Sequence, residues 1–273
     1  MPDLEALAAL RELAVLLHAD GSPFVLVGAG ARVLLLDEPL RLGSLRATDD
    51  WDLGVQTGSW EGFRALRSRL EAAGFLPDGH VEHRFRHARG VPVDLVPFGG
   101  LEHAPGRIRW PRDEGEMAVL GFAEALESAD VLDLDGVPLP VARLPLQAVL
   151  KFFAFDARRD PDDLTDLRLL LLHGADHDNE RIFTELGAWL ADGILAFEDA
   201  GAALLGLDAA RLLRTDTARA LLPIAAALAD PGRPELAWLI RRLGDEADEA
   251  RQRAALARSF AAFLTPFAPF GGS

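Results

Sequence analysis

The stretch RATDDWDLGV, residues 46–55, decides how the rest of the chain is interpreted. Apolar and polar residues alternate along it, which predicts a β-strand with Trp51 and Leu53 facing the core. Asp50 and Asp52 then share the opposite face, about 6–7 Å apart. Two carboxylates so close repel each other unless a positive charge compensates them. We expect a divalent cation to supply that compensation.

A further aspartate, Asp94, lies within the apolar segment VPVDLVPF, which also reads as a strand. If this strand pairs with the first, roughly 4.8 Å away, Asp94 joins Asp50 and Asp52. Three hard oxygen ligands that leave positions open for water suit Mg²⁺ or Mn²⁺. The sequence therefore predicts a metal site formed by these three carboxylates.

Two other segments suggest phosphate binding. In VLVGAGAR, a strand runs into Gly28 and Gly30 and then a short helix that stops before Pro39. The glycines offer backbone N–H groups to a phosphate or form only a tight turn. Lys151 is the single lysine beside 27 arginines and lies in an apolar helix. Its ammonium either extends along the surface to reach solvent or is directed at triphosphate oxygens. Asp163 and Asp166, three residues apart, either orient Lys151 or favour the start of their own helix.

The order of the predicted elements separates two regions. Residues 1–142 mix strands and helices, and residues 143–273 are almost entirely helical in pattern. The fold class expected is α+β, a small mixed sheet flanked by helices followed by an all-helical domain. Within the first region, residues 83–98 read as a hairpin that turns near Gly90. Its basic strand, 84–89, is expected to be a solvated or phosphate-facing edge next to Asp94. The segment 106–116 reads as a loop.

Composition restricts the function classes. The chain is 49% hydrophobic, contains no cysteine and has no apolar run of the roughly 18 residues that a membrane span needs. The N-terminus lacks the features of a secretory signal, so we expect a cytoplasmic protein. The net charge of −15 argues against an extended nucleic-acid groove. It suits a cationic small molecule or a basic protein partner, or serves only solubility.

Together these segments resemble the nucleotidyltransferase superfamily with the polymerase-β-like fold. The pattern is most similar to that of the abortive-infection-type (AbiEii-like) nucleotidyltransferases: a Gly-rich turn, Arg-x-Thr-x-Asp-x-Asp, a later single Asp, and a Lys helix followed by Asp-x-x-Asp. The resemblance covers roughly residues 20–170. The matching residues are Gly28, Gly30, Arg46, Thr48, Asp50, Asp52, Asp94, Lys151, Asp163 and Asp166.

The resemblance implies transfer of a nucleoside monophosphate from an NTP such as ATP, with release of pyrophosphate. Asp50 and Asp52 would hold Mg²⁺ or Mn²⁺, and Asp94 would complete the site or act as base. Gly28, Gly30 and Lys151 would hold the phosphates, while Arg46 and Thr48 would fix the strand entry or touch the nucleotide. The acceptor stays open between a small molecule, a tRNA end and a protein. A toxin-type enzyme with a cognate antitoxin partner and an antibiotic-modifying enzyme both fit.

Other interpretations remain. The turn reads GAGA where many nucleotidyltransferases have Gly-Ser, so a degenerate, non-catalytic protein that acts by binding a partner is an alternative. GAGARV also partly matches a dinucleotide-binding motif, with Asp50 at the expected distance, but Val33 stands where a third Gly or Ala is expected. His80, His83 and His87 raise the possibility of zinc, yet their spacing in a strand is not that of a helical zinc motif.

Overall fold

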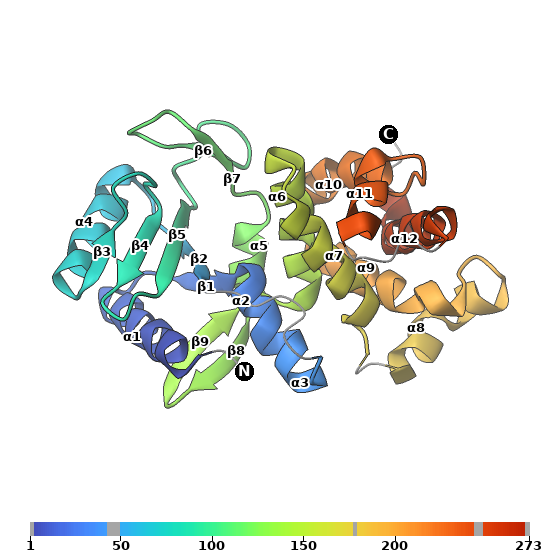
Figure 1. Ribbon diagram of the computed structural model, residues 1–273, viewed down its shortest axis with the longest axis horizontal. Coiled ribbons are helices and arrows are strands. Elements are labelled where there is room, and N and C mark those ends of the chain that lie inside the picture. Colours follow the sequence, from blue (N-terminus) through green and yellow to red (C-terminus); the bar gives the residue numbers. More distant parts are fainter. Residues whose placement is uncertain (1–2, 43–49, 177–178, 243–247, 271–273) are drawn as a thin grey trace. The chain divides into compact units, whose positions relative to one another are not determined.

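The computed structural model describes residues 3–42, 50–176, 179–242 and 248–270 (Figure 1). The chain divides into two compact units, Met1–Arg143 and Leu144–Ser273, and each has its own core. The first unit combines strands and helices, while the described part of the second is helical. The predicted α+β class, a mixed sheet flanked by helices and followed by a helical region, is confirmed.

A seven-stranded mixed sheet forms the centre of the first unit, in the order β3-β4-β5-β2-β1-β9-β8. The parallel pairs are β2 with β5 and β1 with β9, and the other neighbours are antiparallel. The strands are β1 (Phe24–Val27), β2 (Trp51–Gln56), β3 (Phe75–Pro77), β4 (Arg84–His87), β5 (Pro92–Phe98), β8 (Asp130–Leu134) and β9 (Val137–Val141).

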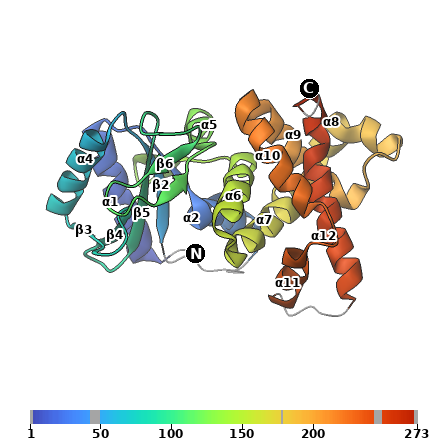
Figure 2. The same ribbon diagram turned by 90° about the horizontal axis from the view of Figure 1, so that it is seen from above.

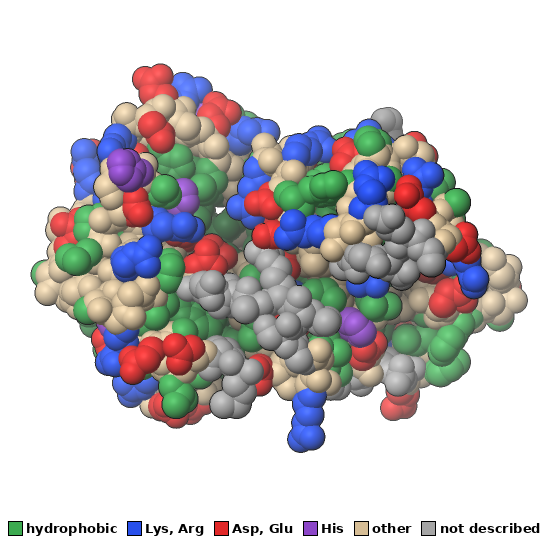
Figure 3. Space-filling view, viewed as in Figure 1, with side chains coloured by type: hydrophobic (Ala, Val, Ile, Leu, Met, Phe, Trp, Pro, Cys, Tyr) green, Lys and Arg blue, Asp and Glu red, His purple; other side chains and the backbone are tan. Residues whose placement is uncertain are grey.

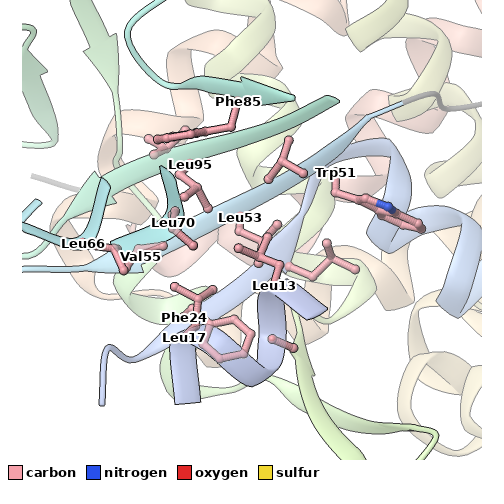
Figure 4. Packing of buried hydrophobic residues seen from close by; sticks show 14 of the residues in the cluster. Leu13, Leu17, Phe24, Trp51, Leu53, Val55, Leu66, Leu70, Phe85 and Leu95 are labelled. Carbon is pink, nitrogen blue, oxygen red and sulfur yellow. The ribbon is translucent and has the colours of Figure 1, made fainter. Parts of the chain in front are cut away.

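Helices cover both faces of this sheet. The helices of the unit are α1 (Leu4–Asp20), α2 (Gly28–Arg32), the π-helical turn η1 (Val33–Asp37), α3 (Glu38–Leu40), α4 (Trp60–Ala72) and α5 (Phe122–Glu127). Leucines of α1 and α4 pack with Leu53 and Val55 in the buried cluster of Figure 4. A Cβ built on Gly54 would instead lie 2.4 Å from the Phe122 ring of α5. Since neighbouring residues of a strand point to opposite faces, α5 covers the other face.

Two local predictions in this unit are wrong. The segment expected to be a loop forms a two-stranded sheet of β6 (Arg107–Arg109) and β7 (Glu116–Ala118), because Ile108 is fully buried and anchors the hairpin. The helix expected to stop before Pro39 runs on to Leu40. Proline occupies one of the first positions of α3, where a missing N–H is tolerated.

The second unit consists of helices around a central α9 (Figure 2). Its helices are α6 (Leu144–Arg158), α7 (Pro161–His173), α8 (Asn179–Ala191), η2 (Phe197–Asp199), α9 (Ala200–Leu212), α10 (Thr215–Leu228), α11 (Pro234–Arg242), α12 (Glu249–Leu264) and η3 (Thr265–Phe270). A Cβ on Gly206 of α9 would lie 2.0 Å from the carbonyl oxygen of Phe263, so a glycine lets α9 approach α12 closely. Among the described residues, no helix combines the length and apolar character needed to cross a membrane.

Candidate functional site

One row of residues across four strands builds the candidate site. In this row Asp52 of β2 lies opposite Val27 of β1 on one side and Asp94 of β5 on the other, and Asp94 lies opposite Arg84 of β4. Directly paired residues present their side chains on the same face of a sheet. The register therefore places Asp52, Asp94 and Arg84 side by side on one face.

Asp50, just before β2, completes a cluster of three carboxylates with Asp52 and Asp94. One oxygen from each of the three lies within 4.8 Å of the other two. Asp94 is buried, whereas Asp50 and Asp52 are half-buried. We call these three residues the carboxylate triad.

Gly28, which follows β1, makes room for the triad. Its φ is +71°, and a Cβ built there would lie 2.0 Å from a carboxylate oxygen of Asp52. Any larger residue would displace that carboxylate as well as strain the backbone. Gly30 makes room in the same way for the ring of Trp51, 2.5 Å from its hypothetical Cβ. Both glycines of the turn thus have a packing reason, in addition to any role in binding phosphate.

Arg84 supplies positive charge to the triad. Its Nε donates to Asp94 Oδ1 and its Nη2 to Asp94 Oδ2, both at 2.7 Å. The same Nη2 reaches Asp50 Oδ2 at 3.5 Å. The hydrogen bonds to Asp94, opposed by partial burial, raise the pKa of Arg84 above its ordinary value, so the guanidinium stays charged.

Among the described residues, the contacts show one other basic side chain beside the triad, that of His83. Its Nε2 lies 3.7 Å from Asp94 Oδ2. Burial lowers the pKa of His83, and the negative charge of Asp94 only partly opposes this. Trp110, itself buried, packs against the imidazole with ring centroids 5.3 Å apart and shields it from water. His83 is therefore neutral near pH 7, and Arg84 carries the positive charge.

The donor set of the triad fits a hard divalent cation. All three groups are carboxylates, which Mg²⁺ and Mn²⁺ prefer. Arg84 offsets part of the negative charge that the three carboxylates carry when they are ionised. Two of the groups are half-buried, which leaves them accessible to an ion and its water ligands.

The second unit holds another charged cluster, between α6 and α7. Lys151 Nζ lies 3.0 Å from Asp163 Oδ1 and 2.7 Å from Asp166 Oδ2, and both aspartates are fully buried. Arg158 also donates to both oxygens of Asp163 at 2.7 Å. Burial acts to raise the pKa of Asp163, but hydrogen bonds from Arg158 and the charge of Lys151 outweigh it, so the pKa is lowered. Both aspartates contact Lys151, and Asp163 also lies in the first turn of α7.

Each unit by itself brings together some of the residues that the sequence singles out. The first assembles the triad beside Gly28, and the second assembles Lys151 with its two aspartates. Arg46 and Thr48 lie outside the described residues.

The expectation of a basic edge at residues 84–89 is wrong. The strand β3 covers the outer side of β4, so β4 is not an edge. Arg84 binds the triad, Arg86 donates to the carbonyl oxygen of Gly90, and Arg89 pairs with Glu5 and Glu12 of α1. These arginines compensate carboxylates and carbonyls of the protein itself.

No protein-family model and no curated protein matches the chain. Similar solved structures include an antigenic nucleotidyltransferase-like protein from Paracoccidioides brasiliensis, with 16% identity over 62% of this chain and 77% of that one, at a TM-score of 0.40. The antibiotic-resistance factor ANT(2'')-Ia in solution has 16% identity over 69% of this chain and 92% of that one, at 0.38. The same factor in complex with adenylyl-2''-tobramycin has 15% identity over 69% and 98%, at 0.37. Similarity at this level assigns no function, so the function is inferred from the site itself.

Proposed function

We propose that the chain is a metal-dependent nucleotidyltransferase, which moves a nucleoside monophosphate from an NTP to an acceptor hydroxyl. The observation that carries this proposal is the carboxylate triad, in which one oxygen of each group lies within 4.8 Å of the others. Carboxylates held so close on neighbouring parallel strands form a site for Mg²⁺ or Mn²⁺. A bound ion would neutralise charge on the phosphates and polarise the phosphorus–oxygen bonds.

The residues of the chain have distinct roles in this reaction. Asp50 and Asp52 would hold the ion, and Asp94 would complete the site on the acceptor side or take the proton of the acceptor hydroxyl. The acceptor oxygen forms a bond to the α-phosphorus, and the bond from this phosphorus to the bridging oxygen of pyrophosphate breaks. The backbone N–H groups at Gly28 and Gly30 would bind the departing phosphates.

The proposed acceptor is a hydroxyl-bearing molecule that is small and cationic, or a protein. The net charge of −15 attracts cations and repels the phosphates of a long RNA. The arginines of residues 84–89, which would otherwise suit an RNA end, are engaged with carboxylates and a backbone carbonyl of the chain. A panel of aminoglycosides, polyamine alcohols, tRNA and proteins, each with labelled ATP and Mg²⁺, distinguishes these acceptors.

Thermal unfolding with each NTP and Mg²⁺ tests the donor and the metal together. A ligand at 100 times its Kd adds about 2.7 kcal/mol to the free energy of unfolding. We expect a Mg²⁺-dependent shift with at least one NTP, and loss of both the shift and pyrophosphate release in Asp52→Asn. Glu71→Gln, an exposed carboxylate on α4, is the matched control and should behave like the wild type.

Three results would contradict the proposal. Full pyrophosphate release by Asp52→Asn would remove the triad from the reaction. A shift with NAD that ignores Mg²⁺ would support dinucleotide binding instead, and no shift with any nucleotide would support a non-catalytic protein that acts by binding.

A further inference from the structure

The guanidinium of Arg84 occupies the position in the triad where a cation is needed. It donates to both oxygens of Asp94 at 2.7 Å and reaches Asp50 at 3.5 Å, so it bridges two of the three carboxylates. A divalent ion held by the triad would use oxygens of the same two carboxylates. The ion and the guanidinium therefore share ligands and repel each other at close range.

We propose that Arg84 is a built-in counter-cation that weakens the binding of a free divalent ion to the triad. This inference rests on the proposed metal site and concerns a residue that the nucleotidyltransferase proposal does not use. Arg84 touches two of the three carboxylates and therefore reduces the negative charge that the triad offers to an ion.

The opposite effect, that Arg84 strengthens metal binding by orienting Asp94, is the weaker one. Asp94 is buried, and its backbone is fixed between β2 and β4 by the pairing of β5. A buried side chain on a central strand has few rotamers to choose from, so it keeps its direction without Arg84. Removing the positive charge of Arg84 therefore has the larger effect on metal affinity, because that charge repels a doubly charged ion at short range.

The arrangement also favours a metal ion that arrives with a nucleotide. The Arg84 side chain is about a third exposed, so it has room to leave Asp94. A triphosphate brings negative charge that can accept the guanidinium as the ion takes its place among the carboxylates. A divalent ion without nucleotide carries no negative group that could accept the guanidinium. Arg84 would thus hold the triad neutralised until metal and nucleotide enter together.

Mn²⁺ binding in the absence of nucleotide, followed by electron paramagnetic resonance of the free ion, tests this directly. We expect Arg84→Gln to bind Mn²⁺ about tenfold or more tightly than the wild type, which corresponds to about 1.4 kcal/mol. Arg84→Lys keeps the charge and should stay near the wild type. Arg86→Gln, on the same strand but bonded only to a backbone carbonyl in the described contacts, is the matched control and should also stay there.

The outcomes separate this inference from the proposed function. Equal or weaker binding by Arg84→Gln, with measurable binding by the wild type, overturns the counter-cation role and leaves the metal site standing. Tight binding by Arg84→Lys equal to that of Arg84→Gln overturns it too, since charge would not be the cause. Failure of both the wild type and Arg84→Gln to bind millimolar Mn²⁺ removes the metal site and with it both proposals.

A measurement on the wild type keeps the test independent of whether Arg84→Gln folds. The Nε–H of Arg84 donates to Asp94 at 2.7 Å, so its proton resonance should be protected from exchange with water. Titration with Mg²⁺ and a nonhydrolysable ATP analogue should shift this resonance and increase its exchange. An unchanged Nε–H signal while the complex binds would show that Arg84 stays on Asp94, and would overturn the inference.

Discussion

Gly28 shows how one residue without a side chain positions a reactive one. Its φ of +71° and the 2.0 Å between its hypothetical Cβ and Asp52 Oδ2 are two separate reasons for glycine. Gly21, which ends α1, shares only the first: its φ is +74°, and a Cβ there would meet nothing within 4 Å. The two glycines therefore separate backbone strain from crowding of the triad.

The prediction at this scale compares Gly28→Ala with Gly21→Ala. Both should lose roughly 1–2 kcal/mol of unfolding free energy from the left-handed backbone. Only Gly28→Ala should also weaken Mn²⁺ binding, by about tenfold or more, because the methyl group displaces the Asp52 carboxylate. Urea unfolding and Mn²⁺ titration of the two variants measure these effects. Wild-type Mn²⁺ affinity in a folded Gly28→Ala variant would show that the close approach is not needed.

The sequence was sufficient to predict the triad, because strand alternation and one parallel pairing bring its members together. It was also sufficient, in principle, to find Arg84. The turn before β5 leaves three residues between His87 and Val91, with Gly90 in the left-handed conformation at φ +84°. A three-residue hairpin loop of this kind fixes the register, and counting back from it pairs Arg84 with Asp94. The basic strand is not an outer edge because β3 lies beyond it, and β3 is too short to stand out in the sequence.

At the scale of elements, the pairing of α6 with α7 depends on charges buried between them. Lys151 on α6 contacts Asp163 and Asp166 on α7, and both aspartates are fully buried. The helix periodicity of the sequence predicts each helix and places the two aspartates on one face. It does not predict that their partner comes from the preceding helix, because that contact depends on how the two helices pack.

We expect Lys151→Met to lower the free energy of unfolding by about 3–5 kcal/mol at pH 7, because it leaves buried carboxylates without their ammonium partner. Arg158→Gln is the control: the Arg158 side chain also bonds to Asp163 but is 58% exposed, so water can replace part of what it supplies. Arg158→Gln should lower the free energy of unfolding clearly less than Lys151→Met does. Urea unfolding followed by circular dichroism gives both values, and equal losses would contradict a special role for the buried lysine.

The same pair of helices sets a pH dependence. Because the pKa of Asp163 is lowered in the folded state, its stabilisation is complete above the unfolded-state pKa of about 3.9 and is lost as the pH falls through the folded-state pKa. In Lys151→Met the buried carboxylates can become neutral by taking up protons on acidification. The difference in unfolding free energy between wild type and variant should therefore narrow below about pH 4. A difference that stays constant from pH 7 to pH 3 would exclude the ion pairs as its cause.

At the scale of the whole molecule, the net charge is large, but many acidic and basic side chains lie next to one another. The chain carries 43 acidic and 28 basic residues, and many of the arginines pair with carboxylates, as Arg181 does with Asp208 and Glu185. On the face shown in Figure 3, acidic and basic side chains are interspersed. Composition alone gave the net charge. The pairing of arginines with distant carboxylates, such as Arg89 with Glu5 and Glu12, required the fold.

This distribution predicts weak binding of nucleic-acid duplexes. A protein that neutralises Z phosphates shows a logarithmic affinity that falls with the logarithm of salt concentration at a slope of about −0.9Z. Arginines that already compensate carboxylates of the chain are poor phosphate ligands, and the net charge of −15 repels the duplex. We expect no anisotropy change of a labelled duplex with micromolar protein at physiological salt, and none on moderate dilution of the salt. Reversing the charge of an engaged carboxylate, by Glu12→Lys beside Arg89, should begin to create binding. Tight, steeply salt-dependent binding by the wild type would instead show a basic surface that outweighs the net charge, and would bring an RNA acceptor back ahead of a cationic small molecule.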